Sequence, residues 1–284
     1  MKKVYPIIVT YNPELEILIQ NIKELSKNID RVIICNNSPN VSLAYLENFF
    51  DTLKVFDFYE NLGIAKAQNI GMQYAFNNKA EFVIQFDQDS IVSINMIKLL
   101  CESFLNLKNK RVNVGVIGPI PFNKDECIKK INISKIRYKN ENKIISSGML
   151  IPKEVYLKNG GMKEEWFIDL VDYEFCWRLK KNKYKIIIDT GVSLPHRFGE
   201  GNIKLLKLYT IRKVKPFRLY YEFRNGLYYL KTSYIPFLEK IKCLIRLIML
   251  IPISLIFFDD RRERFFFIRK GIKGFFKKEN GVLK

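Results

Sequence analysis

The first 110 residues alternate short, nearly continuous apolar runs with stretches of helical periodicity, and this alternation restricts the fold more than any other feature. The apolar runs are residues 3–11, 31–38, 53–61 and 81–86. A strand that is buried on both faces needs no alternation of polar and apolar residues. The pattern therefore predicts an α/β fold, in which a mixed, mainly parallel sheet is covered by helices on both faces.

The character of the chain changes twice along its length. From about residue 110 the apolar runs become shorter, and a helix is expected from about Asp169. From residue 203 onward the sequence is helical, aromatic and basic. We therefore expect one domain over residues 1–202, with a first part to about residue 110 and a second part over 111–202, followed by a helical extension over 203–284.

The positive charge is concentrated in that extension. The whole chain has a formal charge of +19, of which residues 201–284 contribute +14 and residues 1–200 only +5. An anionic partner is therefore expected for the extension. Five cysteines are scattered without a CxxC pair, which indicates reduced thiols in the cytoplasm rather than a disulfide framework or a zinc site.

Polar residues follow three of the predicted strands at the point where each strand ends. In sheets of this class the ligand lies beyond the carboxyl ends of the strands. A ligand site is therefore predicted at this edge. The three clusters are Thr10-Tyr11-Asn12, Asn36-Asn37-Ser38 and Asp87-Gln88-Asp89.

The third cluster carries the strongest signal. Two carboxylates two residues apart on a turn can bind a hard divalent cation and leave positions free for phosphate oxygens. A solvated acidic turn is the alternative for Asp87 and Asp89 taken alone. The buried strand before them and the other two polar strand ends favour the metal site.

Three further features suggest chemistry, each with a structural alternative. Asn61, Gly63 and Asn69 surround an expected helix start, where backbone N–H groups favour phosphate or sugar oxygens, although glycines also serve plain turns. Asp169 and Asp172 are expected on one helical face, where one could act as a general base or both could simply favour the helix start. Glu174 and Arg178 fit an exposed i,i+4 ion pair.

The only histidine, His196, lies in the segment PHRFG after an expected strand. A lone histidine is more often a surface or core residue than a ligand. At this place it could supply nitrogen ligation beside a carboxylate.

Taken in order, these motifs resemble those of family 2 glycosyltransferases, whose nucleotide-sugar domain has the GT-A fold. The resemblance rests on VTYNP, NNS, ENLGIAKAQNIG, DQDS, FIDLVDYEFCWR and PHRFG over roughly residues 4–200. It continues in YYEFRNGLYYL and RKGIKGFFKKENG, which look most like the rhamnosyltransferase branch of bacterial surface polysaccharide synthesis. The resemblance implies an inverting transfer from dTDP-rhamnose or a UDP-sugar to a hydroxyl of a glycan or lipid-linked acceptor.

The same resemblance implies roles for individual residues. It implies that Thr10, Tyr11 and Asn12 line the nucleotide pocket, and that Asn61, Gly63 and Asn69 lie near the donor. It implies that Asp87 faces the ribose or metal, that Asp89 coordinates Mn²⁺ or Mg²⁺, and that His196 lies near the metal. It also implies that Asp172 is the base. Asn36 stands where the family usually has an aspartate that binds the base of the nucleotide, which leaves base selectivity open. Arg224, with Asn225, reaches the acceptor or diphosphate, or makes a structural helix contact.

Two other classes of protein compete with this interpretation. A sugar-phosphate nucleotidyltransferase would need a glycine-rich, basic phosphate loop directly after the first strand, and VTYNPELE offers neither. A non-catalytic basic protein that binds membrane or nucleic acid leaves the acidic pair and the polar strand ends unexplained. We therefore expect an enzyme, with no nucleic acid among its partners.

The extension contains an apolar run over residues 247–258 that is too short to span a bilayer and includes Pro252. It predicts either a helical hairpin packed on the catalytic domain or a segment at an anionic membrane surface. Because a lipid-linked acceptor lies in the same plane, the second alternative predicts a cytoplasmic enzyme held peripherally on the inner face of the cell membrane.

Overall fold

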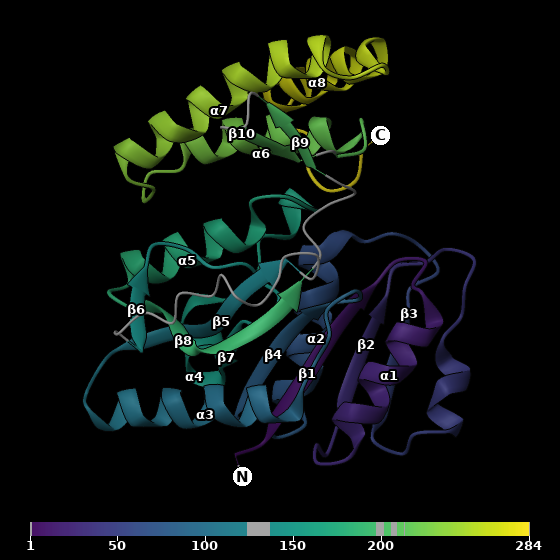
Figure 1. Cartoon of the computed structure of the whole chain (residues 1–284), viewed down its shortest axis with the longest axis vertical. Coiled ribbons are helices and arrows are strands. Elements are labelled where there is room, and N and C mark those ends of the chain that lie inside the picture. Colours follow the sequence, from purple (N-terminus) through teal and green to yellow (C-terminus); the bar gives the residue numbers. More distant parts are fainter. Residues whose placement is uncertain (1, 124–136, 197–201, 206–208, 213, 284) are drawn as a thin grey trace.

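The computed structural model describes residues 2–123, 137–196, 202–205, 209–212 and 214–283 (Figure 1). Within these residues the centre of the molecule is an eight-stranded sheet. The strands, in their order across the sheet, are β3 (Leu53–Asp57), β2 (Val32–Asn36), β1 (Val4–Thr10), β4 (Phe82–Asp87), β7 (Leu150–Pro152), β5 (Val114–Asn123), β8 (Lys185–His196) and β6 (Tyr138–Glu141).

The sheet is mixed but mainly parallel, as predicted. Strands β3, β2, β1 and β4 run parallel, and so do β5 and β8. The short strand β7 lies antiparallel between β4 and β5, and β6 is antiparallel to β8 at the edge. Because β1 to β4 are all parallel, their carboxyl ends meet at one edge of the sheet.

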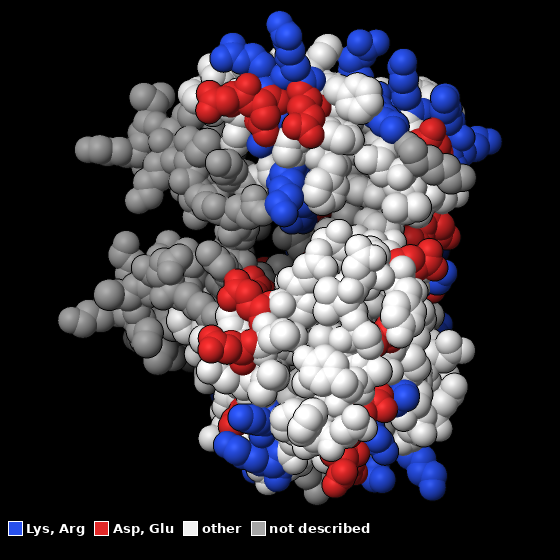
Figure 2. Space-filling model, turned by 90° about the vertical axis from the view of Figure 1, so that its right-hand side faces the viewer, with Lys and Arg blue, Asp and Glu red and all other residues white. Residues whose placement is uncertain are grey.

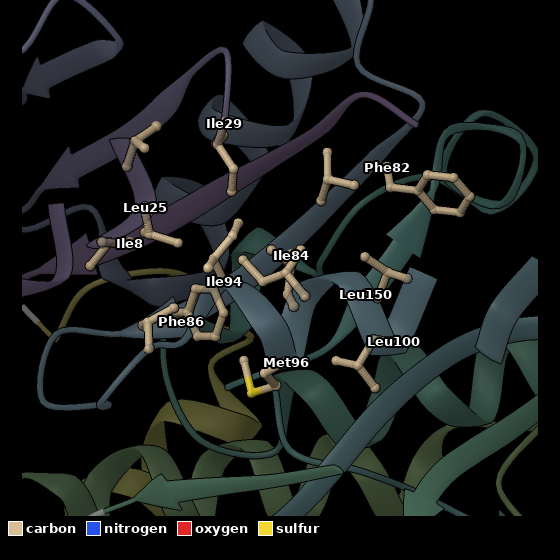
Figure 3. Close-up of a cluster of buried hydrophobic side chains, with 14 of the residues drawn as sticks. Ile8, Leu25, Ile29, Phe82, Ile84, Phe86, Ile94, Met96, Leu100 and Leu150 are labelled. Atoms are coloured by element: carbon tan, nitrogen blue, oxygen red, sulfur yellow. The ribbon is translucent and has the colours of Figure 1, made fainter. Parts of the chain in front are cut away.

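Helices cover both faces of the sheet, which the apolar runs require. Successive side chains of a strand point to opposite faces, so Ile8 enters one core and Ile7 the other. The first core, part of which is shown in Figure 3, lies under α1 (Leu15–Ser26) and α3 (Ile94–Asn109). The second lies under α2 (Gly63–Asn77), α4 (Lys153–Asn159) and α5 (Val171–Lys181).

The C-terminal residues form a separate helical layer at the end of the molecule opposite the N-terminus (Figure 1). Helix α6 (Arg218–Lys231) packs against both α7 (Phe237–Ile256) and α8 (Arg261–Phe276), and a small apolar core joins the three. The strands β9 (Asn202–Leu205) and β10 (Tyr209–Arg212) pair with each other and precede helix α6 in the sequence. Among the described residues, no helix combines the length and the apolar character needed to cross a membrane.

Some local expectations differ from the structure. Helix α1 begins at Leu15, and the helix expected from about Asp169 begins at Val171. Tyr138 opens the short edge strand β6. The described cysteines, which are Cys35, Cys101, Cys176 and Cys243, are free thiols, and Cys127 lies outside the described residues.

A close approach of α2 to the sheet offers a test of this packing. A β-carbon on Gly71 would lie 2.8 Å from Cγ2 of Ile7 and 3.1 Å from Sγ of Cys35, both fully buried. We expect Gly71→Val to destabilise the fold by about 1–3 kcal/mol through overpacking, measured by urea unfolding. The exposed control Gln73→Ala on the same helix should stay within about 0.5 kcal/mol of the parent; equal effects would contradict the packing.

Candidate active site

Polar side chains line up across the carboxyl edge of the parallel strands. Thr10 is in register with Asn36, Asn36 with Asp57, and Val9 with Asp87. The ends of β1, β2, β3 and β4 thus bring together residues that are distant in the sequence. Thr10 and Asp87, for example, are 77 positions apart. The polar edge predicted from the strand ends is confirmed by this register.

Asn36 has a structural role at this edge. It is fully buried, and its side-chain oxygen accepts hydrogen bonds from the Thr10 hydroxyl at 3.1 Å and from the Ser38 N–H at 3.0 Å. Its amide nitrogen donates to the carbonyl of Val41 at 2.6 Å and to the carboxylate of Asp57 at 2.7 Å. These bonds fill the amide's capacity, so Asn36 ties three strand ends together.

Asp57 was missed in the sequence interpretation. Its carboxylate accepts bonds from Asn36, from the Ser42 hydroxyl at 2.7 Å and from the N–H groups of Leu43 and Ala44. These donors hold the pKa of Asp57 below its usual value in spite of its partial burial. The expected run over residues 53–61 continued past Asp57, whereas in the structure β3 ends at Asp57.

The segment after β1 is anchored but open. The N–H of Asn12 donates to the Ser38 hydroxyl at 2.7 Å, and its backbone has a φ of 46°. The N–H of Tyr11 donates to the side chain of Gln88 at 2.6 Å, which connects this segment to the Asp87–Asp89 turn. The Tyr11 side chain is 48% exposed and is accessible to a ligand.

The start of helix α2 adjoins this edge, as predicted. Asn37 accepts a bond from the N–H of Leu62 at 3.0 Å, and Asn61 accepts one from the N–H of Gly63 at 3.0 Å. Gly63 has a φ of 80°, and a β-carbon there would lie 2.5 Å from the ring of Phe167. Glycine is therefore required both by the backbone conformation and by the neighbouring loop.

Asn69 lies farther along α2 and has a structural role. Its side chain exchanges two hydrogen bonds with the backbone of Met162, at 2.7 and 2.9 Å, and also donates to Glu164 at 2.8 Å. The structure thus places Asn69 in a contact between α2 and the 162–164 segment.

Asp87 ends β4 beside a pair of buried serines. The hydroxyl of Ser147 accepts a bond from the Asp87 N–H at 3.5 Å and lies 2.7 Å from the hydroxyl of Ser90. Gly148, with a φ of 81°, allows the chain to turn there, and its N–H donates to the carbonyl of Gln85 at 2.7 Å. Ser147 was also missed from sequence. Asp87 and Asp89 are both half-buried.

Asp172 lies in the first turn of α5 and is electrostatically coupled to Asp87. Burial is the main reason that the pKa of Asp172 is raised to about 7, and the negative charge of Asp87 also raises it. The N–H groups of Tyr173 and Ser146 act in the opposite direction and lower this pKa. The charge of Asp87 thus acts on Asp172 in the folded protein, although 85 residues separate the two in the sequence.

The expectation that Asp169 shares a helical face with Asp172 is wrong. Asp169 precedes α5, has a φ of 66°, and forms an ion pair with Arg218 of α6. The pair expected between Glu174 and Arg178 exists, with contacts of 2.9 Å, but Glu174 is fully buried rather than exposed.

Arg224 is bonded away from the polar edge that the carboxyl ends of β1 to β4 form. It is fully buried and donates to the carbonyls of Glu165, Trp166 and Gly281 at 2.8–3.2 Å. Of its two expected roles, the structural helix contact is the one that the structure contains. His196 ends β8, and its side chain lies outside the described residues.

The donor set at the end of β4 suits a hard divalent cation. Asp87 and Asp89 supply carboxylate oxygens, which Mg²⁺ and Mn²⁺ prefer, and their partial exposure leaves them accessible. Within the described part of the chain, no three Asp, Glu, Cys or His side chains are grouped closely enough to hold a metal by themselves. A cation would therefore complete its coordination with phosphate oxygens or water, as Mg²⁺ commonly does.

The architecture and the edge site define a nucleotide-sugar transferase with a GT-A fold. A model of the family described as glycosyl transferase family 2 matches residues 6–156. The chain is also 32% identical over 253 residues to dTDP-rhamnosyl transferase RfbF of Shigella flexneri, covering 84% of this chain and 83% of that protein. The chain belongs to glycosyl transferase family 2.

Solved structures agree on the fold. The crystal structure of GalNAc-T7 with UDP, GalNAc and Mn²⁺ matches with a TM-score of 0.60 at 13% identity, over 98% of this chain and only 56% of that one. S. aureus TarS 1–349 matches with a TM-score of 0.57 at 15% identity, over 96% of this chain and 80% of that one. The predicted GT-A fold and glycosyltransferase activity are thus confirmed, and neither competing class of protein is supported.

The position of Asp172 predicts a conflict between stability and function. The pKa of Asp172 is about 7 in the folded protein, against a usual value of 3.8 in the unfolded chain. Between these two pH values the folded protein therefore keeps a proton on Asp172 that the unfolded chain has released. The free energy of unfolding therefore decreases as the pH rises from about 4 to 7. In EDTA, Asp172→Asn should match the parent near pH 4 and melt a few degrees higher, about 2–4 °C per kcal/mol, at pH 8. A difference in Tm that is the same at both pH values would contradict the burial of this charge.

Proposed function

We propose that this family 2 glycosyltransferase inverts the configuration of a sugar as it transfers it from a nucleotide diphosphate to a hydroxyl of a glycan or lipid-linked saccharide. The reaction would serve bacterial surface polysaccharide synthesis. The similarity to a dTDP-rhamnosyl transferase favours dTDP-rhamnose as donor over a UDP-sugar. The observation that supports a direct displacement is the coupling of Asp172 to Asp87 in one site.

Asp172 is the general base in this proposal. A carboxylate with a pKa of about 7 can take the proton of the acceptor hydroxyl at neutral pH and still be ionised in a large fraction of molecules. Asp169 acts through its ion pair with Arg218, and so it positions the loop before Asp172 rather than the reacting atoms. One base and one donor are sufficient for inversion, without a covalent intermediate.

Asp87 and Asp89, with His196 from the end of β8, would hold Mn²⁺ or Mg²⁺. When bound, such a cation neutralises the negative charge that develops on the leaving nucleoside diphosphate. The exposed Tyr11, Asn12 and the 61–63 segment would bind the nucleotide, and the buried Thr10 and Asn36 hold this edge in place.

A donor screen with two variants tests the proposal. Hydrolysis and transfer are measured over dTDP- and UDP-sugars with Mn²⁺, and we expect dTDP-rhamnose to give the highest rate. Asp172→Asn should lose at least about 10²-fold in kcat because the base is removed, with donor binding retained. Asp89→Ala should lose the increase in Tm that dTDP with Mn²⁺ causes in the parent. Full activity of Asp172→Asn would contradict the proposal.

We also propose that the enzyme attaches peripherally to the inner face of the cell membrane, where a lipid-linked acceptor is located. Helix α7 supports this with an exposed apolar face along its length, beside which lie the exposed Lys242 and Arg246. The large side chains on this face that are 37–74% exposed are Phe237, Leu238, Ile241, Leu244, Ile245, Ile248, Met249 and Ile256. A single helical face of this composition matches an interfacial helix.

The neighbouring helix α8 adds positive charge. Its exposed Phe265 and Phe266 alternate with exposed arginines such as Arg262 and Arg269. Lys and Arg side chains line the end of the molecule formed by this helical layer (Figure 2). Apolar side chains beside positive charge suit a bilayer with anionic headgroups better than a neutral one.

Vesicle sedimentation tests the attachment. The parent should bind vesicles that contain phosphatidylglycerol and bind phosphatidylcholine vesicles weakly. Ile245→Glu with Ile248→Glu should reduce binding at least tenfold, because burying each isoleucine contributes roughly 1.5–3 kcal/mol. The matched control is Phe49→Glu with Leu157→Glu, which changes two apolar residues of the catalytic domain that are even more exposed than Ile245 and Ile248. Equal loss in both double variants would contradict a role for the α7 face.

A further inference from the structure

The loop of residues 165–170, directly before the proposed base, has an unusual backbone. Phe167, Asp169 and Leu170 all have positive φ values, between 63° and 66°, and none is a glycine. Each such residue costs of the order of 1 kcal/mol or more and persists only where neighbouring groups hold it. This loop leads into α5 at Val171, so its conformation sets where Asp172 lies.

Helix α6 of the C-terminal layer supplies the groups that hold the loop. The side-chain amide nitrogen of Asn225 donates to the loop carbonyls of Trp166, Ile168 and Asp169, at 2.7–3.1 Å. Its two N–H groups are shared among these three acceptors. Arg218, two turns earlier, forms the ion pair with the Asp169 carboxylate. Asn225 is fully buried, so these bonds replace water that the loop carbonyls would otherwise need.

Arg224 extends the same support to the end of the chain. Its guanidinium donates to the carbonyls of Glu165 and Gly281 and lies 5.1 Å from the ring centres of both Tyr220 and Tyr221. The N–H of Gly281 in turn donates to the carbonyl of Glu165 at 2.9 Å. The loop is therefore bound both by α6 and by the C-terminal tail.

The opposite side of the loop contacts the start of helix α2, which adjoins the polar edge of the sheet. The carbonyl of Phe167 accepts a bond from the N–H of Ala65 in the first turn of α2, at 3.3 Å. The Phe167 ring lies against Gly63 and stacks on Tyr221 of α6, with centres 4.8 Å apart and an angle of 11°. The loop is thus enclosed between the helix start proposed to bind the donor and the C-terminal layer.

We propose that Asn225, assisted by Arg224, is a positioning residue for the transfer reaction. By holding three carbonyls of a loop that would not keep its conformation alone, it fixes Asp172 relative to Asp87. The C-terminal helices are therefore part of the active site and do more than attach the enzyme to a membrane. This inference depends on the proposed role of Asp172 as the base.

The test compares two variants of α6 in the full-length enzyme. Asn225→Ala removes the three donated bonds, and we expect kcat to fall about 10²-fold, the loss expected when a reacting group is displaced by about 1 Å. The donor KM and the affinity for the nucleoside diphosphate should stay within about threefold of the parent. A loss of kcat at unchanged donor binding is a result that general destabilisation does not produce.

Glu222→Gln is the matched control, because Glu222 is also buried on α6 but forms an ion pair with Arg246 of α7. It should lower Tm and leave kcat unchanged. If Asn225→Ala does not fold, Arg218→Ala replaces it, since Arg218 is half-exposed and forms an ion pair with Asp169 in the loop; about a tenfold loss in kcat is expected. Loss of kcat no larger than in Glu222→Gln would overturn the inference.

The two proposals fail in different ways. If Asp172→Asn keeps full transfer activity, the proposed function is wrong whatever Asn225 does. If Asp172→Asn is inactive while Asn225→Ala keeps the kcat of the control, only the positioning role is wrong.

Discussion

The parallel register of β1 to β4 is the constraint on which the rest of the structure depends. Parallel strands end together, so the hydrogen-bonding groups that follow them are brought to one edge. Asn36 is the centre of that edge, because its buried amide bonds Thr10 on one side and Asp57 on the other. An apolar side chain at this position would leave the Asp57 carboxylate without one of its donors.

A second constraint arises from placing carboxylates near one another in a partly buried site. Burial disfavours the ionised form of Asp172 and raises its pKa, and the negative charge of Asp87 adds to this effect. In a glycosyltransferase this cost has a use, since a base must have a pKa near the working pH and a cation must find negative charge. The same arrangement reduces the stability of the empty protein at neutral pH.

Much of the fold could be predicted from the sequence because the signals were local. The apolar runs of β1 to β4 and the glycine at the start of α2 each reflect a requirement of the segment itself. The polar strand ends followed from the same pattern. Asp57 was missed because the apolar run over residues 53–61 continues past it, and only the structure ends β3 at Asp57.

The residues whose roles were wrongly predicted depend on distant parts of the chain. Asp169 looked like a helical neighbour of Asp172, but three left-handed residues and Arg218 of α6 hold it outside the helix. Arg224, for which a ligand contact and a structural helix contact were both expected, makes the structural contact and is buried against the 165–170 loop and the C-terminal tail. Periodicity and strand ends are encoded in neighbouring residues, so the chain alone specified the layers and the polar edge. Which carboxylate is buried beside another, and which arginine is used for packing, depends on contacts between residues 49 or more positions apart in the sequence. These contacts exist only in the folded molecule.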